Sequence, residues 1–304
     1  MDVIWQERLS GARAEQVRDL VAAAAEVDGR APIGEHVMMN LGNGEGNHLV
    51  ATERPGGPVV GYAYLDLTGD NDGNVVAELA VHPSHRRQGT GSALVEGLLA
   101  KAPDPAALRI WAHGETPAAT RLAEKFGLRR ARELWRMRRP LSDAEPLPTR
   151  ATPEGVVLRT FRPGADEAAM VAVNNRAFSW HPEQGGWTEE DVRAREAEDW
   201  FDADGFFLAE RDGRVIGFHW TKVHPASPGT GGEPIGEVYV VGIDPDAQGG
   251  GLGSVLTLAG LHHLRSLGLP AVMLYVESDN TSAIRVYQKL GFDKWDADVQ
   301  FAGK

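Results

Sequence analysis

The fold is decided by the stretch Gly242-Ile243-Asp244-Pro245-Asp246-Ala247-Gln248-Gly249-Gly250-Gly251-Leu252-Gly253-Ser254. It follows a β-rich run from Glu237 to Ile243 and precedes an apolar helical pattern from Gly253 to Leu267. Glycines at such a strand-to-helix turn let backbone N–H groups converge on one point, and the helix N-terminus adds its dipole. The stretch therefore predicts an anion site suited to a pyrophosphate, with a plain glycine-rich turn as the simpler alternative. It is not a Walker loop, because no Gly-Lys-Ser/Thr follows, nor a Rossmann fingerprint, because the glycine spacing differs.

The chain repeats this pattern. Residues Ala80 to Leu94 match Gly242 to Leu256 at an offset of 162, with one proline and two glycines in register. A second pair follows in the same order, because Arg121 to Leu128 match Arg285 to Phe292 at an offset of 164. Two motifs in one order at nearly one spacing indicate an internal duplication.

The segment between the repeats, residues 141–155, holds three prolines and few large apolar residues, which indicates a linker. We therefore expect domains at residues 1–140 and 156–304. Each half is expected to form an antiparallel meander that runs into a βαβ unit. This gives an α/β fold with a mixed, mostly antiparallel central sheet and helices on both faces. The expected helices are 12–27, 89–101, 117–126, 253–267 and 283–290, and the expected strands are 59–67, 75–81, 108–112, 134–138, 206–210, 215–223, 237–243, 271–276 and 295–301.

Composition narrows the class of protein. The 304 residues are 42% hydrophobic and 24% charged, as in a globular protein, and carry a net charge of -12. Such an acidic chain with only short basic clusters is not expected to bind nucleic acid. No apolar run is long enough for a membrane span, and the N-terminus does not resemble a signal peptide. Because there is no cysteine and no metal-ligand spacing, we expect no disulfide, no metal site and a cytoplasmic protein.

These motifs resemble the GCN5-related N-acetyltransferases, the GNAT family. Members carry Gln/Arg-x-x-Gly-x-Gly/Ala after their fourth strand, a pattern present here from Gln248 to Gly253 and from Arg86 to Gly91. The segment Asn280 to Phe292 is similar to the family's Asn-x-x-Ala-x-x-x-Tyr-x-x-x-Gly-Phe. The resemblance implies acetyl-CoA as co-substrate and direct attack of an amine on the thioester.

That chemistry needs a base, donors for the carbonyl and an acid for the departing sulfur. Glu237, on the fourth strand, is the candidate base, with a solvated strand carboxylate as the alternative. Tyr287, one helical turn after Ala283, is the candidate acid, because a phenol with a pKa of about 10 can protonate a thiolate; a core tyrosine is the alternative. Backbone N–H groups near Val241 to Ile243 would polarise the carbonyl.

The first half lacks both proton-transfer groups. The offsets place Val75 opposite Glu237, Ala123 opposite Tyr287 and Thr116 opposite Asn280. We therefore expect the first half to bind acetyl-CoA without catalysing. The acetyl-CoA contacts implied by the resemblance are Leu79, Ala80, Val81, Arg87, Gln88, Gly89, Thr90, Gly91, Ser92, Val241, Gly242, Ile243, Gln248, Gly249, Gly250, Gly251, Leu252, Gly253, Ser254, Asn280, Thr281, Ser282, Ala283, Ile284 and Arg285.

The whole chain resembles the mycothiol synthase family of tandem acetyltransferases. The most distinctive similar segment is His181-Pro182-Glu183-Gln184-Gly185-Gly186-Trp187. That family acetylates the cysteinyl amine of a cysteine–glucosamine–inositol conjugate, the last step of mycothiol biosynthesis. The resemblance implies substrate contacts at Glu35, Glu183, Lys222, Glu237 and Tyr275. The alternatives are acetylation of another amine (a protein N-terminus, a polyamine or an aminoglycoside) and a non-catalytic acyl-CoA sensor. We expect a monomer with small-molecule partners.

Overall fold

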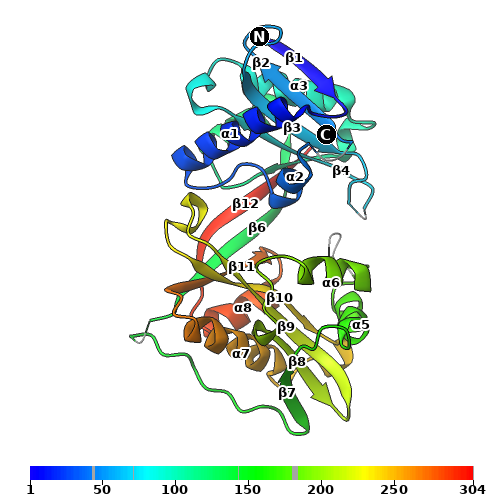
Figure 1. Ribbon diagram of the computed structural model, residues 1–304, viewed down its shortest axis with the longest axis vertical. Coiled ribbons are helices and arrows are strands. Elements are labelled where there is room, and N and C mark those ends of the chain that lie inside the picture. Colours follow the sequence, from blue (N-terminus) through cyan, green and yellow to red (C-terminus); the bar gives the residue numbers. More distant parts are fainter. Residues whose placement is uncertain (43–44, 71, 143, 180–183, 304) are drawn as a thin grey trace. The chain divides into compact units, whose positions relative to one another are not determined.

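The protein is described by a computed structural model that covers residues 1–42, 45–70, 72–142, 144–179 and 184–303 (Figure 1). The chain separates into two compact units. Unit 1 comprises Met1–Leu134 together with Asp296–Lys304, and unit 2 comprises Trp135–Trp295. Each unit has its own cores and its own copy of the glycine-rich turn.

Unit 1 is built on a sheet in which β4 and β5 are parallel and the other paired neighbours are antiparallel. The strand order is β1-β2-β3-β4-β5, and the end of β12 (Asp293–Ala302) follows β5. Its elements are β1 (Asp2–Gln6), α1 (Gly11–Asp28), α2 (Glu35–Asn40), β2 (Asn47–Thr52), β3 (Val59–Asp66), β4 (Val75–Val81), α3 (Thr90–Lys101), β5 (Leu108–Ala112) and α4 (Pro117–Lys125).

Unit 2 repeats this plan with the strand order β7-β8-β9-β10-β11, and β6 (Arg129–Pro140) lies beyond β11. Here β10 and β11 are parallel, while β7, β8, β9 and β10 are antiparallel neighbours. Its elements are β7 (Val156–Thr160), α5 (Glu167–Ala177), α6 (Glu189–Glu196), β8 (Phe206–Arg211), β9 (Arg214–His224), β10 (Ile235–Ile243), α7 (Leu252–Ser266), β11 (Ala271–Glu277) and α8 (Thr281–Lys289).

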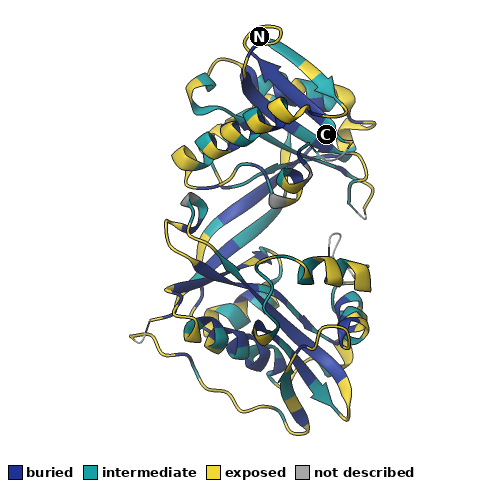
Figure 2. Cartoon of the chain, viewed as in Figure 1, coloured by how far each residue is buried: buried dark blue, intermediate teal, exposed yellow. Residues whose placement is uncertain are grey.

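Both faces of each sheet are covered, so the strands are the most buried part of the chain (Figure 2). In unit 1, α1 packs on one face around Val17 and Leu20, and α3 packs on the other around Leu94 and Leu98. In unit 2, one face carries α5 and α6 and the other carries α7 and α8. The expected α/β fold, with helices on both faces of mixed sheets, is confirmed.

The two units exchange the ends of long strands. The strand β12 (Asp293–Ala302) begins in unit 2, but its residues from Asp296 onward belong to unit 1, where Val299 pairs with Ala112 of β5. The strand β6 (Arg129–Pro140) begins in unit 1, and its residues from Trp135 onward belong to unit 2. The compact units change over at Trp135 and at Asp296, and the domains at residues 1–140 and 156–304 stay a prediction.

Candidate active site

The glycine-rich turn of unit 2 forms an open cradle at the start of α7. Gly249, Gly250 and Gly251 all have positive φ (93°, 59° and 83°), a conformation that other residues rarely adopt. Gly251 is the N-cap of α7 and no side chain caps the helix, so the N–H groups of its first turn point outward. A Cβ on Gly249, Gly250 or Gly253 would meet nothing within 4 Å. Arg150 adds a cation, with Nη1 4.0 Å from where a Cβ of Gly251 would lie.

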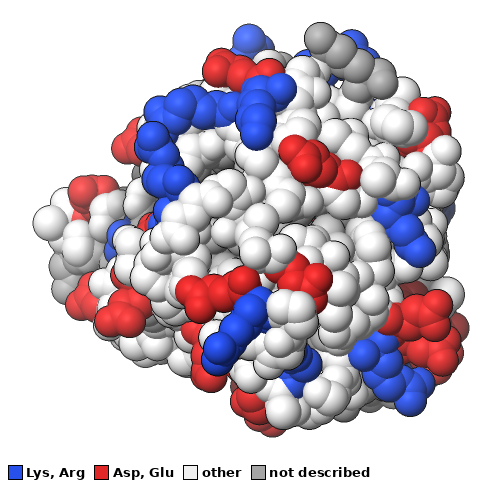
Figure 3. All heavy atoms as spheres, turned by 90° about the horizontal axis from the view of Figure 1, so that it is seen from above, with Lys and Arg blue, Asp and Glu red and all other residues white. Residues whose placement is uncertain are grey.

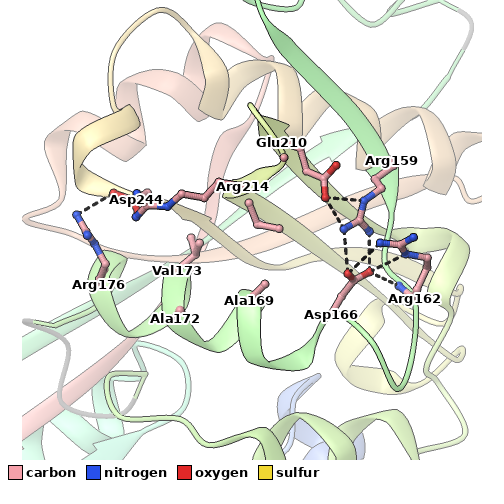
Figure 4. A pocket seen from close by; sticks show the side chains of 12 residues that line it. Arg159, Arg162, Asp166, Ala169, Ala172, Val173, Arg176, Glu210, Arg214 and Asp244 are labelled. Carbon is pink, nitrogen blue, oxygen red and sulfur yellow. Dashed lines mark hydrogen bonds and ion pairs between the residues drawn. The ribbon is translucent and has the colours of Figure 1, made fainter.

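The cradle is anchored by Asp244, the last residue before the turn. The buried carboxylate of Asp244 accepts from the backbone N–H of Asp246 (3.0 Å) and pairs with Arg176 (3.0 Å) and Arg214 (3.2 Å). These three residues border a cavity of about 410 Å³ whose other end carries Arg159 bound to Asp166 (Figure 4). Arginines of this cavity are thus held by carboxylates, and the ion pairs fix the end of β10 from which the cradle starts.

The strand before the cradle separates from its neighbour. A β-bulge at Tyr239 shifts the register between β9 and β10, and β10 pairs with β11 only from Gly236 to Val238. Beyond Val238, the edge of β10 that faces β11 has no strand paired to it among the described residues. Val241 to Ile243, the residues predicted to polarise a bound carbonyl, lie on this part of β10.

Glu237 lies just before this bulge and is only 6% exposed. Its Oε2 atom is 2.5 Å from Nε2 of His224, whose side chain is 25% exposed. Lys222 is the cross-strand neighbour of Glu237 and is also buried, with Nζ 4.5 Å from the centre of the Trp200 ring. Glu237 is thus a buried carboxylate at the point where the two strands separate, and its partner His224 reaches solvent.

Tyr287 extends from α8 and packs half-buried against the core beneath β11, 5.9 Å from the ring centre of Phe292. Burial raises the pKa of Tyr287 to about 12, so its phenol keeps its proton at neutral pH. Asn280 caps the helix that carries it, because its side chain accepts from the N–H of Ala283 (3.1 Å). Two residues of the expected substrate set cannot be placed in the site. Glu183 lies outside the described residues, and the side chain of Glu35, the first residue of α2, is not described.

Comparison with known proteins assigns the family. The family model "Acetyltransferase (GNAT) family" matches residues 15–128 and again 173–292. The chain is 56% identical to a mycothiol acetyltransferase of Actinosynnema mirum over 99% of both chains, and 55% identical to one of Saccharomonospora viridis over 98% of both. The chain belongs to the GNAT family of acetyltransferases, among the mycothiol acetyltransferases. A tandem GNAT protein of the clavulanic acid pathway shares the fold, with a TM-score of 0.70, 22% identity and coverage of 99% of this chain and 97% of that one.

This acetyltransferase keeps a second cradle in unit 1. Arg87 and Gly89 adopt positive φ (63° and 90°) at the positions of Gly249 and Gly251, and Gly89 begins α3 without a side-chain cap. The backbone strain of an arginine in this conformation costs on the order of 1 kcal/mol. The turn keeps its shape although Arg87 stands where unit 2 has a glycine. Lys125 donates to Ser92 in the first turn of α3 (2.8 Å), and a Cβ on Gly91 would lie 3.4 Å from the side chain of Leu122.

In unit 1 the position equivalent to Tyr287 belongs to the hydrophobic core. Ala123 of α4 is 3% exposed and packs with Val299 and Phe301 from the exchanged end of β12. Thr116 replaces Asn280 and keeps its capping role, accepting from the N–H of Ala119 (3.2 Å). The strand β4 also lacks a bulge, since its register with β3 runs without a shift from Gly61 to Asp66.

Sequence analysis did not single out Glu78, a carboxylate on β4 of unit 1. Its Oε2 accepts from the N–H of Gly34 at the start of α2 (2.5 Å), and its Oε1 lies 3.4 Å from Nε2 of His113. The other ring nitrogen of His113 is 3.3 Å from Asp298, which also pairs with Arg30 (2.8 Å). This ion cluster occupies the face of β4 that is equivalent to the face of β10 carrying Glu237, and it ties the exchanged strand to the start of α2 and the end of β5.

The ion cluster makes the stability of unit 1 depend on pH. Burial alone would lower the pKa of His113, but its hydrogen bonds and ion pairs with Asp298 and Glu78 raise it to about 9. Because this lies above the ordinary value of 6.5, the stabilisation is complete below pH 6.5 and is lost as pH rises through 9. We expect His113→Gln to lower the free energy of unfolding by on the order of 2 kcal/mol at pH 6, and by much less at pH 9.5.

Urea unfolding at the two pH values checks this expectation. The matched control is His262→Gln, a change at an exposed histidine of α7, which should cost the same small amount at both. An equal loss for His113→Gln at pH 6 and pH 9.5 would show that the imidazolium does not stabilise the cluster.

Among the described residues, no group of histidine and carboxylate side chains could hold a metal ion, and no helix is long and apolar enough to span a bilayer. Sequence analysis did not single out His224 or Arg150, which reach the site from other parts of unit 2. No local sequence pattern marks them, because each is an ordinary strand-end or linker residue that only the fold brings to β10 or to the cradle.

Proposed function

We propose that the chain transfers the acetyl group of acetyl-CoA to the cysteinyl amine of the cysteine–glucosamine–inositol conjugate, the last step of mycothiol biosynthesis. The observation that carries this is the identity of 56% with a protein named mycothiol acetyltransferase over 99% of both chains. The site of unit 2 supports it, because a buried carboxylate, a strand edge without a paired neighbour among the described residues and a glycine-rich cradle follow one another along the chain.

The residues of unit 2 suit acetyl-CoA. The cradle from Gln248 to Ser254 would hold the pyrophosphate through backbone N–H groups, and the unpaired edge from Val241 to Ile243 would hold the acyl arm. The start of α8, from Asn280 to Arg285, would flank the arm on the other side. When bound, acetyl-CoA supplies a thioester carbonyl for the amine to attack.

Three groups of the chain would then handle the protons and the developing charge. Glu237 accepts the ammonium proton, and its 2.5 Å contact with His224 offers the proton a route to solvent. Backbone N–H groups near Val241 donate to the carbonyl oxygen as charge builds on it. Tyr287 donates its phenolic proton to the sulfur as the thiolate leaves, which a phenol that stays protonated at neutral pH can do.

The acceptor contacts are proposed from the buried polar groups around Glu237 and from the family resemblance. Lys222 stands beside Glu237 on β9, and Tyr275 is exposed on β11 two residues beyond Met273, the register partner of Glu237. Glu35 and Glu183 complete the proposed set. Figure 3 shows acidic and basic side chains interspersed on the face it draws, which suits small-molecule partners better than nucleic acid. We propose a cytoplasmic monomer.

We propose further that unit 1 binds acetyl-CoA without catalysing. Gly251→Ala and Gly89→Ala place the same methyl group and similar strain at equivalent turns, since the two glycines have φ of 83° and 90°. Gly251→Ala should raise the KM for acetyl-CoA by about tenfold, the equivalent of 1.4 kcal/mol, while Gly89→Ala leaves turnover unchanged. Steady-state kinetics of the two variants measure this, and equal loss in both would place catalytic acetyl-CoA in unit 1 as well.

The acceptor is tested by incubating the pure protein with acetyl-CoA and the conjugate, and detecting the acetylated product by mass spectrometry. Spermidine, an aminoglycoside and a peptide N-terminus serve as competing amines. Rapid acetylation of the conjugate alone is the expected result. Turnover of another amine only would remove the proposed acceptor, and acetyl-CoA binding without turnover of any amine would favour a sensor.

A further inference from the structure

An aromatic platform lies exposed on the sheet of unit 2. It consists of Tyr275 on β11 and Trp295 on β12, with Arg136 and Arg138 of β6 beside them. The two aromatic residues are 40% and 37% exposed, although most large apolar side chains of the unit are buried. The guanidinium carbon of Arg136 is 4.3 Å from the ring centre of Trp295 and 5.9 Å from that of Tyr275, and Arg138 is 4.8 Å from the Trp295 ring. We call these four residues the Trp295 platform.

The platform is held in place from below. Arg136 is only 5% exposed, and its Nη2 atom donates to the carbonyl oxygen of Gly229 (3.2 Å) and lies 3.9 Å from the sulfur of Met273. A buried guanidinium stacked on a ring contributes roughly 0.5–2 kcal/mol to fixing it. The rings are therefore exposed but already ordered. Binding of a ligand to them costs the protein little additional side-chain entropy.

The Trp295 platform shares a face of the sheet with Glu237. Glu237 and Met273 are register partners on β10 and β11, so their side chains lie on one face. Tyr275 follows Met273 by two residues and lies on the same face, about 7 Å further along the strand. Arg136 contacts Met273 and Tyr275 and brings Trp295 to this face. The opposite face at the same strands carries Leu274, Val276 and Met137 in the core beneath α7.

We infer that the Trp295 platform binds the polyhydroxylated rings of the acceptor. This inference rests on the proposed function, in which the cysteinyl amine is at Glu237 and the sugar and cyclitol extend away from it. A hexose or cyclitol ring presents an apolar C–H face, which packs on an exposed aromatic ring, and hydroxyl groups at its rim, which accept from guanidinium N–H groups. The platform offers both kinds of group on the same face as the base and a short distance from it, so it selects amines that carry such rings.

The test compares two acceptors with the same reacting group. Cysteine N-methylamide keeps the amine, thiol and amide of the conjugate but carries no ring. Trp295→Ala should raise the KM for the conjugate at least tenfold, leave the KM for acetyl-CoA unchanged, and leave kcat/KM for cysteine N-methylamide unchanged. Trp295→Phe, which keeps an aromatic ring, should restore much of the affinity for the conjugate. Leu267→Ala, at another exposed apolar side chain of unit 2, is the matched control and should change neither acceptor.

A binding experiment tests the Trp295 platform independently of acetyl transfer. Titration of the protein with glucosaminyl-inositol, followed by calorimetry, should show saturable binding that Trp295→Ala weakens at least tenfold. If the wild-type protein binds this ring compound but acetylates no conjugate, the proposed acceptor fails and the platform stands. If the wild-type protein acetylates the conjugate and Trp295→Ala changes its KM by less than twofold, or reduces both acceptors equally, the platform is overturned. Absence of both binding and acetylation overturns both.

Discussion

Tyr287→Phe should reduce kcat at least 100-fold while leaving the KM for acetyl-CoA within about twofold, because loss of a general acid typically costs a factor of 10²–10⁴. The substitution removes only the hydroxyl group. The remaining ring can still pack 5.9 Å from Phe292 and against the core beneath β11, so the fold is preserved. Pre-steady-state release of CoA, followed with a thiol reagent, measures the step in which the sulfur receives its proton.

The matched control is Tyr62→Phe in unit 1. Tyr62 is also buried and its hydroxyl is 2.9 Å from Nδ1 of His48, so its loss should lower stability by about 1 kcal/mol and leave kcat unchanged. If Tyr287→Phe kept full turnover, the sulfur would receive its proton from water or from another group, and Tyr287 would be a core residue.

Removal of residues 296–304 should unfold unit 1 while unit 2 stays folded. Six consecutive residues, from Ala297 to Ala302, are at most 6% exposed, and they supply the neighbour of β5 and the partners of Arg30 and His113. Burial of one valine or phenylalanine alone contributes roughly 1.5–3 kcal/mol. The combined loss is comparable with the whole stability of a typical domain, about 5–15 kcal/mol.

Hydrogen exchange measured by mass spectrometry distinguishes the units. Amides of α1 and β3 should exchange rapidly in the truncated chain, while amides of α7 and β9 keep their protection. A chain cut by protease within the linker at residues 147–155 is the control, because that cut leaves the exchanged strand in place. Unchanged protection of α1 after truncation would mean that unit 1 is complete without β12.

The cradle, the repeat and the family could be predicted from the sequence because they depend on local patterns. The strands from 75 to 81 and from 108 to 112 begin and end where the periodicity places them. The helices α2, α5 and α6 and the strands β1, β2 and β7 were not predicted. The helix α6 is short and consists mostly of charged residues, and its stability comes from the capping box of Thr188 and from packing of Val192.

Two features needed the three-dimensional structure. A constant offset places Val75 opposite Glu237, but the bulge at Tyr239 shifts the register of β10 by one residue, so the strand positions correspond to Val76 instead. The offset also hid Glu78, which lies two residues further along the same face. The strand exchange is equally invisible to local patterns, because only long-range pairing decides which sheet each end of β6 and β12 joins.

The exchanged strand sets the order in which the molecule is made. Residues 108–112 of β5 leave the ribosome long before residues 299–302, which pair with them, and the whole of unit 2 is synthesised in between. The half of the chain that is translated first is therefore the half that is finished last, with an open sheet edge and an unpaired Arg30 until then. A chain whose synthesis stops anywhere in the second half therefore lacks the last strand of unit 1, and we expect its first half to stay incomplete however much of unit 2 has been made.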